Sequence, residues 1–213
     1  MSGNSVAIAI TGASGALYAT RTLAALLTRG VHVELVISDY GRRLLRDELG
    51  DQATVENLMP YLNARFGDGV AAGTIAVHSN RDLGATIASG SHGCSGMAIV
   101  PCSMKTLAGV AHGLSRSLVE RAADVMLKER RPLVLVPRET PLSTIHLENM
   151  LALSRAGAII VPPSPGFYTL PQTVADLVDF VVARVLDQLR VPHTLAPRWG
   201  EGRSGESTPG TRA

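Results

Sequence analysis

The sequence contains few aromatic residues and few cysteines. Aromatic side chains make up only 4% of the 213 residues, whereas hydrophobic residues as a whole make up 46%. A core of this composition must be built from Ala, Val, Ile and Leu, the usual filling of a parallel sheet covered by helices. The two cysteines, Cys94 and Cys102, form no CxxC pair, so neither a zinc site nor a disulfide framework is indicated.

A strong charge bias and long apolar runs are also absent. Charged residues amount to 18% and the formal net charge is +2, far from the basic excess of a nucleic-acid-binding domain. No apolar run is long enough to span a membrane, and the N-terminus lacks the basic start of a signal peptide. The histidines show no metal-binding spacing, so no metal site is predicted. We expect a cytoplasmic protein that binds small anions rather than nucleic acid or membranes.

Short apolar runs alternate with helical patterns along the chain. This alternation predicts an α/β protein with a Rossmann-like, doubly wound, mostly parallel sheet in a single domain. We place the domain at residues 1–196. Residues 197–213, rich in Gly, Ser, Thr, Pro and charges, are interpreted as a C-terminal tail that is mobile or docked on a neighbouring subunit. Strands are expected at 6–10, 31–37, 74–77, 97–100, 132–136 and 158–161, and helices at about 17–28, 39–49, 55–66, 104–112, 118–128, 146–155 and 174–189.

Small and polar residues follow several predicted strands. Residues 11–16 join a buried strand to a helix N-terminus, where free N–H groups and the helix dipole favour a phosphate. Without a GxGxxG or Gly-Lys-Ser/Thr pattern, a mononucleotide is favoured over a dinucleotide or nucleoside triphosphate. Ser38, Ser103 and Thr106 are either helix caps or ligand contacts. Because ligands of doubly wound sheets sit beyond the carboxyl ends of the strands, these loops are expected to converge on one site.

Several charged side chains stand where a charge needs a partner. Arg138 and Glu139 follow a predicted buried strand, where they either pair with each other or meet a ligand. Arg121 and Lys128 lie two helical turns apart and can share one face of a helix. Arg184 lies in an apolar stretch, and its partner could be a neighbouring acidic residue, another subunit or a phosphate. Residues 89–91 could form an anion-binding nest or an ordinary surface turn.

Together these motifs resemble the UbiX-type flavin prenyltransferases. The match runs from residue 6 to about residue 199. It rests on Thr-Gly-Ala-Ser-Gly-Ala at 11–16, Ser-Gly-Ser at 89–91, Pro-Cys-Ser-x-x-Thr-Leu at 101–107, the basic segment 121–133, Pro-Arg-Glu-x-Pro at 137–141 and Gly-Phe-Tyr at 166–168. The resemblance implies an enzyme that, without a metal, joins a dimethylallyl group from dimethylallyl phosphate to N5 and C6 of reduced FMN.

The resemblance further implies a homo-oligomer, commonly a dodecamer, with sites between subunits, and a product used by a UbiD-type decarboxylase. It implies FMN contacts at Gly12, Ala13, Ser14, Ser38, Ser103, Met104, Lys105, Thr106 and Arg138. It implies substrate contacts at Ser89, Gly90, Ser91, Arg121, Lys128, Glu139, Tyr168 and Arg184. Catalytic roles are implied for Ser14, Glu48, Lys128, Glu139 and Tyr168. Leu83 stands where some family members have Trp.

Two other functions remain open at the level of the sequence. One is a non-catalytic FMN-binding accessory subunit, which would need only the FMN contacts. The other is a flavin-dependent cysteine-type decarboxylase, for which a catalytic His and an Asn-rich motif are expected after the middle strand, where this chain has Pro-Cys-Ser at 101–103. The sequence leaves open whether the donor is dimethylallyl monophosphate or pyrophosphate.

Overall fold

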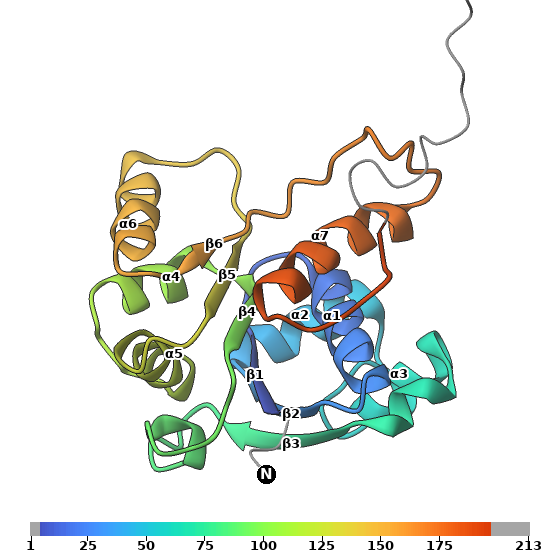
Figure 1. Cartoon of the computed structure of the whole chain (residues 1–213), viewed down its shortest axis with the longest axis horizontal. Coiled ribbons are helices and arrows are strands. Elements are labelled where there is room, and N and C mark those ends of the chain that lie inside the picture. The colour runs from blue at the N-terminus through green and yellow to red at the C-terminus, as the bar shows by residue number, and fades with distance from the viewer. Residues whose placement is uncertain (1–4, 197–213) are drawn as a thin grey trace, which may run out of the picture.

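The computed structural model describes residues 5–196, so the predicted C-terminal tail at 197–213 lies outside the described residues. These residues form one six-stranded sheet in the order β3-β2-β1-β4-β5-β6 (Figure 1). Every neighbouring pair of strands is parallel. The strands are β1 (Ser5–Ile10), β2 (His32–Ile37), β3 (Thr74–Ser79), β4 (Met97–Cys102), β5 (Leu133–Pro137) and β6 (Ile159–Ile160). The predicted Rossmann-like α/β fold is confirmed, and the described sheet is parallel throughout.

Helices cover both faces of the sheet. The helices are α1 (Ala16–Thr28), α2 (Asp39–Leu49), α3 (Leu58–Phe66), α4 (Met104–Ala111), α5 (Leu118–Lys128), α6 (Thr144–Arg155) and α7 (Val174–Gln188), with 3₁₀ turns at Asp68–Ala72 and Thr86–Ala88. Buried side chains of α1, α2, α3 and α7 form one apolar cluster with the sheet. Those of α4, α5 and α6 form a second cluster on the other face. Figure 1 shows the two sets of helices on opposite sides of the strands.

The central strands owe their place to unbroken apolar runs. All residues of β1, β4 and β5 are buried, as expected for parallel strands covered on both faces. The predicted strand at 97–100 continues to Cys102, and the predicted helix at 55–66 begins only at Leu58. The strand order reverses between β1 and β4, and in such sheets a crevice for ligands opens there, beyond the carboxyl ends of the strands.

Candidate functional site

The carboxyl ends of β1 and β4 are joined by Thr11. Its Oγ1 donates to the Pro101 carbonyl at 2.9 Å and accepts from the Ser103 N–H at 2.8 Å. The Thr11 N–H also donates to the Pro101 carbonyl, at 3.2 Å. Thr11 is only 1% exposed. Its hydroxyl bond to Pro101 is buried, the bond from Ser103 is part-buried, and together they fix where the loop at Ser103 begins. The sequence interpretation treated Thr11 only as part of the turn and missed this role.

The N-terminus of α1 holds a carboxylate of the protein itself. Glu48, near the end of α2, accepts from the Gly15 N–H at 3.0 Å and from the Ala16 N–H at 2.8 Å. These two N–H groups belong to the turn at 11–16, whose free N–H groups were predicted to bind a phosphate. A phosphate at these two amides would compete with Glu48, which links the last turn of α2 to the first turn of α1.

The glycine at the start of that turn has a packing reason. A Cβ on Gly12 would lie 2.4 Å from the Cβ of Tyr40, so only glycine fits there. Ser14, in the same turn, is exposed, whereas Ala13 is buried. The glycine therefore makes room for the side chain of Tyr40. The same turn also forms part of the edge at which a ligand is predicted to bind.

The two predicted serine contacts both cap helices. Ser38 Oγ accepts from the Gly41 N–H at 3.0 Å and begins α2. Ser103 Oγ accepts from the Thr106 N–H at 3.3 Å and donates to Thr106 Oγ1 at 3.0 Å, at the start of α4. Lys105 is exposed in that same first turn. Capping does not remove the serines from the crevice, because each directly follows the carboxyl end of its strand.

A cavity of about 480 Å³ lies beyond β5 and β6. It is lined by three predicted site residues, Met104, Arg138 and Glu139, together with residues of the loop after β6 such as Pro163. Glu139 is exposed, and its Oε1 accepts from the Thr140 N–H at 3.0 Å. Within the described residues, the Nε of Arg138 is buried without a hydrogen-bond partner. An unpaired donor on a cation beside a cavity suits an anionic or carbonyl-bearing ligand.

The predicted substrate loop at 89–91 lies at the amino ends of the strands, opposite the carboxyl edge that carries Arg138. It precedes β4 and packs against the end of α5, so that a Cβ on Gly90 would lie 2.7 Å from Lys128 Nζ. Lys128 Nζ also pairs with Glu129, and the hydroxyls of Ser89 and Ser91 lie 2.9 Å apart. Because a parallel strand rises about 3.3 Å per residue, five or six residues separate the two edges by about 15–20 Å. Within one chain, this loop therefore does not join the cavity beside Arg138.

The remaining predicted substrate residues are divided between the two faces of the sheet. Arg121, on α5, forms an ion pair with Asp124 at 3.0 Å. On the other face, the ring of Tyr168 meets Phe180 of α7 edge-on, with centroids 5.7 Å apart. The guanidinium of Arg184 lies 5.8 Å from the same Phe180 centroid. Tyr168 and Arg184 therefore both lie against Phe180, whereas Arg121 lies on the other face of the sheet.

Arg184 has an unsatisfied donor as Arg138 does. Its Nη2 lies 3.2 Å from Asp187 Oδ2, which is one of the partners that the sequence left open. In the described part of the chain its Nε is buried without a hydrogen-bond partner. Leu83, for which the sequence resemblance suggested a Trp in some family members, is 49% exposed.

Neither cysteine is placed for nucleophilic chemistry. Burial raises the pKa of the Cys102 thiol to about 12, and burial is also the main cause of the raised pKa of Cys94. Both thiols are free. Across residues 5–196, no group of three or more His, Cys, Asp and Glu side chains is arranged to hold a metal ion. Over the same residues, no helix combines the length and apolar character needed to cross a membrane.

The fold and the site define a class of protein first. A doubly wound parallel sheet whose carboxyl edge carries capped serines, small residues and an arginine with an unpaired nitrogen is a mononucleotide-binding architecture. The flavoprotein family model matches residues 1–186. Relatives narrow the class. A flavin prenyltransferase UbiX of Halalkalibacterium halodurans is 50% identical over 200 residues, covering 94% of this chain and 95% of the relative.

Two solved structures agree with this relation. One, a dodecameric FMN-dependent Ubix-like decarboxylase from Escherichia coli O157:H7, is 47% identical with a TM-score of 0.80, covering 92% of this chain and 98% of the other. The second is AnUbiX (PadA1) in complex with FMN and dimethylallyl pyrophosphate. It is 42% identical with a TM-score of 0.82, covering 92% of this chain and 97% of the other. The chain belongs to the UbiX flavin prenyltransferases, within the flavoprotein family.

Proposed function

We propose that this chain is a flavin prenyltransferase that joins the dimethylallyl group of a dimethylallyl phosphate to N5 and C6 of reduced FMN. The observation that carries the proposal is the buried, unpaired Nε of Arg138 beside the cavity at the carboxyl edge. The chain that carries this arginine is 50% identical to a flavin prenyltransferase over 94% of its length. The relation does not favour the accessory-subunit and cysteine-decarboxylase alternatives.

The residues at the carboxyl edge fit a flavin mononucleotide. FMN contacts are proposed at Gly12, Ala13, Ser14, Ser38, Ser103, Met104, Lys105, Thr106 and Arg138, all of which follow β1, β2, β4 or β5. Reduced FMN, when bound, supplies an electron-rich nucleophile. The protein has to hold it against the donor and keep water away. Ser14 and Glu48 are proposed to move protons near the flavin, a role that Glu48 would combine with its bonds to the start of α1.

The donor side must stabilise a departing phosphate. Charge grows on the phosphate as the allylic C–O bond breaks, so preorganised cations and donors lower the barrier. Arg121, Lys128 and Arg184 supply positive charge, Tyr168 supplies a hydroxyl donor, and Glu139 is the candidate for proton transfer to or from the phosphate. Ser89, Gly90 and Ser91 complete the proposed phosphate pocket.

The placement of these groups supports a site shared between chains. Lys128 and residues 89–91 lie at the amino edge of the sheet, Arg138 at the carboxyl edge, and Arg184 on the face opposite α5. A pocket containing all of them forms only if neighbouring copies each contribute a part. We therefore propose a homo-oligomer with shared sites, and a dodecamer, as in the related Escherichia coli structure, is the proposed size.

The fate of the product and the location of the protein are also proposals. A UbiD-type decarboxylase is proposed as the recipient of the prenylated flavin. A cytoplasmic location is supported by two free cysteines, which are usual in reducing compartments.

Anaerobic mass spectrometry tests the function directly. The purified chain is incubated with reduced FMN and either dimethylallyl monophosphate or pyrophosphate, and the flavin is weighed. An increase by one dimethylallyl group is expected, and the better donor identifies the leaving group. FMN that stays bound and unaltered with both donors would support an accessory subunit, whereas CO₂ release from a cysteine-type peptide would support a decarboxylase. Light scattering tests the assembly, and a fully active monomer would contradict shared sites.

A further inference from the structure

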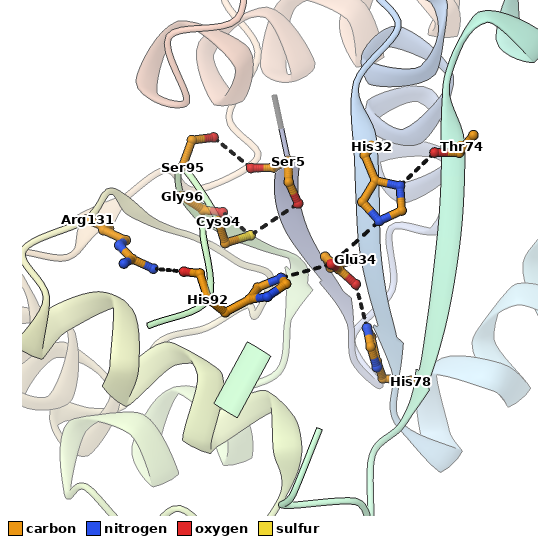
Figure 2. Close-up of polar contacts among 10 residues, drawn as sticks. All are labelled: Ser5, His32, Glu34, Thr74, His78, His92, Cys94, Ser95, Gly96 and Arg131. Atoms are coloured by element: carbon orange, nitrogen blue, oxygen red, sulfur yellow. Dashed lines mark hydrogen bonds and ion pairs between the residues drawn. The ribbon is translucent and has the colours of Figure 1, made fainter. Parts of the chain in front are cut away.

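A buried carboxylate on one strand of the sheet is surrounded by histidines. Glu34, on β2, is only 5% exposed. Its Oε2 lies 2.6 Å from His78 Nε2 on β3, and its Oε1 lies 2.9 Å from His92 Nε2 in the loop before β4. His32 Nε2 lies 3.5 Å from Oε1. Figure 2 shows the imidazoles of His78 and His92 approaching the carboxylate from different sides.

His92 joins this cluster to the loop that carries the predicted phosphate contacts. While its ring faces Glu34, its carbonyl accepts from Arg131 Nη1 at 2.6 Å (Figure 2). Arg131 Nη2 donates to the Gly90 carbonyl at 2.7 Å, and the His92 N–H closes a turn onto the Ser89 carbonyl at 3.2 Å. The loop at 89–92 is therefore held from two sides. Arg131 binds its backbone, and Glu34 binds its one imidazole.

The electrostatics favour an ionised Glu34 as the fixed point. Burial by itself raises the pKa of this carboxyl. The hydrogen bonds from His78 and His92, together with their charge, outweigh burial and hold the pKa below its ordinary value. The titratable groups that face it are His32 on its own strand, His78 on β3, and His92 and Cys94 in the loop. A buried carboxylate of this kind is costly unless its partners stay in place, so it restrains the side chains that pair with it.

We propose that Glu34 is a positioning residue for prenyl transfer: acting through His92, it holds the loop at 89–91 in the geometry that receives the donor phosphate. The inference rests on the proposed function, because that function assigns the phosphate to this loop. Glu34 itself touches no substrate. Its contribution is to keep the two serine hydroxyls and the Gly90 backbone beside Lys128.

Matched variants separate positioning from simple stabilisation. His92→Ala and His78→Ala each remove one imidazole from the same carboxylate, but only His92 belongs to the loop. We expect Glu34→Gln and His92→Ala to raise KM for the donor about tenfold, as for the loss of one hydrogen bond to a charged group. Their kcat at saturating donor and their FMN affinity are expected to stay within about threefold of the unmodified chain on the same basis. His78→Ala should leave the donor KM within about twofold while lowering stability as much as His92→Ala does.

A conservative variant provides a rescue. The side-chain amide of glutamine reaches close to where Nε2 of histidine lies, so His92→Gln can still donate to Glu34 and is expected to recover most of the donor affinity that His92→Ala loses. An equal rise of donor KM in His78→Ala and His92→Ala would overturn the proposal. An unchanged donor KM in both Glu34→Gln and His92→Ala would also overturn it.

Hydrogen exchange of the full-length assembly distinguishes this inference from the proposed function. Amides at 89–93 are expected to exchange faster in Glu34→Gln and His92→Ala than in His78→Ala. Faster exchange there, in a protein whose unmodified form transfers no prenyl group, would refute the function and keep the restraint of the loop by Glu34. Unchanged exchange in a chain that does transfer the group would refute the restraint and leave the function standing.

Discussion

Thr11→Val tests whether the junction between β1 and β4 holds the site together. Valine keeps the shape of threonine and removes its hydroxyl. In the variant the Pro101 carbonyl still accepts from the backbone N–H of residue 11, at 3.2 Å in the unmodified chain. The Ser103 N–H loses its acceptor, the Thr11 hydroxyl at 2.8 Å. The Ser103 N–H is part-buried; leaving it unsatisfied and losing the hydroxyl's own buried bond to Pro101 together cost about 1–3 kcal/mol. With about 2–4 °C of melting temperature per kcal/mol for a domain of this size, a loss near 2 kcal/mol predicts a fall of about 4–8 °C.

The same substitution should weaken FMN binding, because the released amide is that of Ser103 at the start of α4. We expect a loss of up to about tenfold in FMN affinity, the scale of one neutral hydrogen bond. Thr22→Val is the matched control. Thr22 is fully buried, and its hydroxyl donates to the Tyr18 carbonyl one turn earlier in α1, at 2.8 Å. The control variant therefore removes a similar hydroxyl away from the crevice. Calorimetry gives the melting temperature and flavin titration the affinity. Equal effects of the two variants on FMN affinity would refute the reasoning.

Four further outcomes are expected. Arg138→Leu should weaken FMN binding at least about tenfold, as for the loss of a charge-assisted bond. The melting temperature of the flavin-free protein should not fall, because the Nε of Arg138 has no partner within the described residues; a lower melting temperature would assign Arg138 a structural role. Glu48→Gln should lower the unfolding free energy in urea by about 0.5–1 kcal/mol by removing charge from the start of α1; unchanged stability would contradict this. Lys128→Ala and Arg184→Ala should keep FMN bound but slow single-turnover prenyl transfer about a hundredfold or more, and near-normal rates in both would remove them from the phosphate pocket. Because the pKa of Glu34 is lowered, its ionised form contributes stability above the ordinary carboxyl pKa, and this is lost as the pH falls through the lowered value; acid titration of Glu34→Gln should lack that part of the loss.

Much of the architecture follows from the sequence because its signals are local. The unbroken apolar run at Val6 to Ile10 and the pattern of the last long helix need only nearby residues to be recognised, and both elements lie where predicted. The alternation of strands and helices then restricts the chain to a parallel sheet with ligand-binding loops at its carboxyl edge. Arg138 is a candidate on the same grounds, since a charge directly after a buried strand needs a partner.

What the sequence by itself could not determine are the meetings of distant segments. Thr11 bonds to Pro101, Glu48 to Gly15, and Arg131 to the carbonyl of Gly90, and each pair depends on which strands pair and where each helix crosses the sheet. Arg131 in particular lies in the basic segment 121–133, and nothing in that segment of the sequence indicates a contact with residue 90. The division of the predicted phosphate pocket between two edges and two faces has the same origin. Hydrophobic periodicity states which side of an element is buried, but only the packed tertiary structure decides which side chain lies opposite, and therefore which residues can act on one ligand.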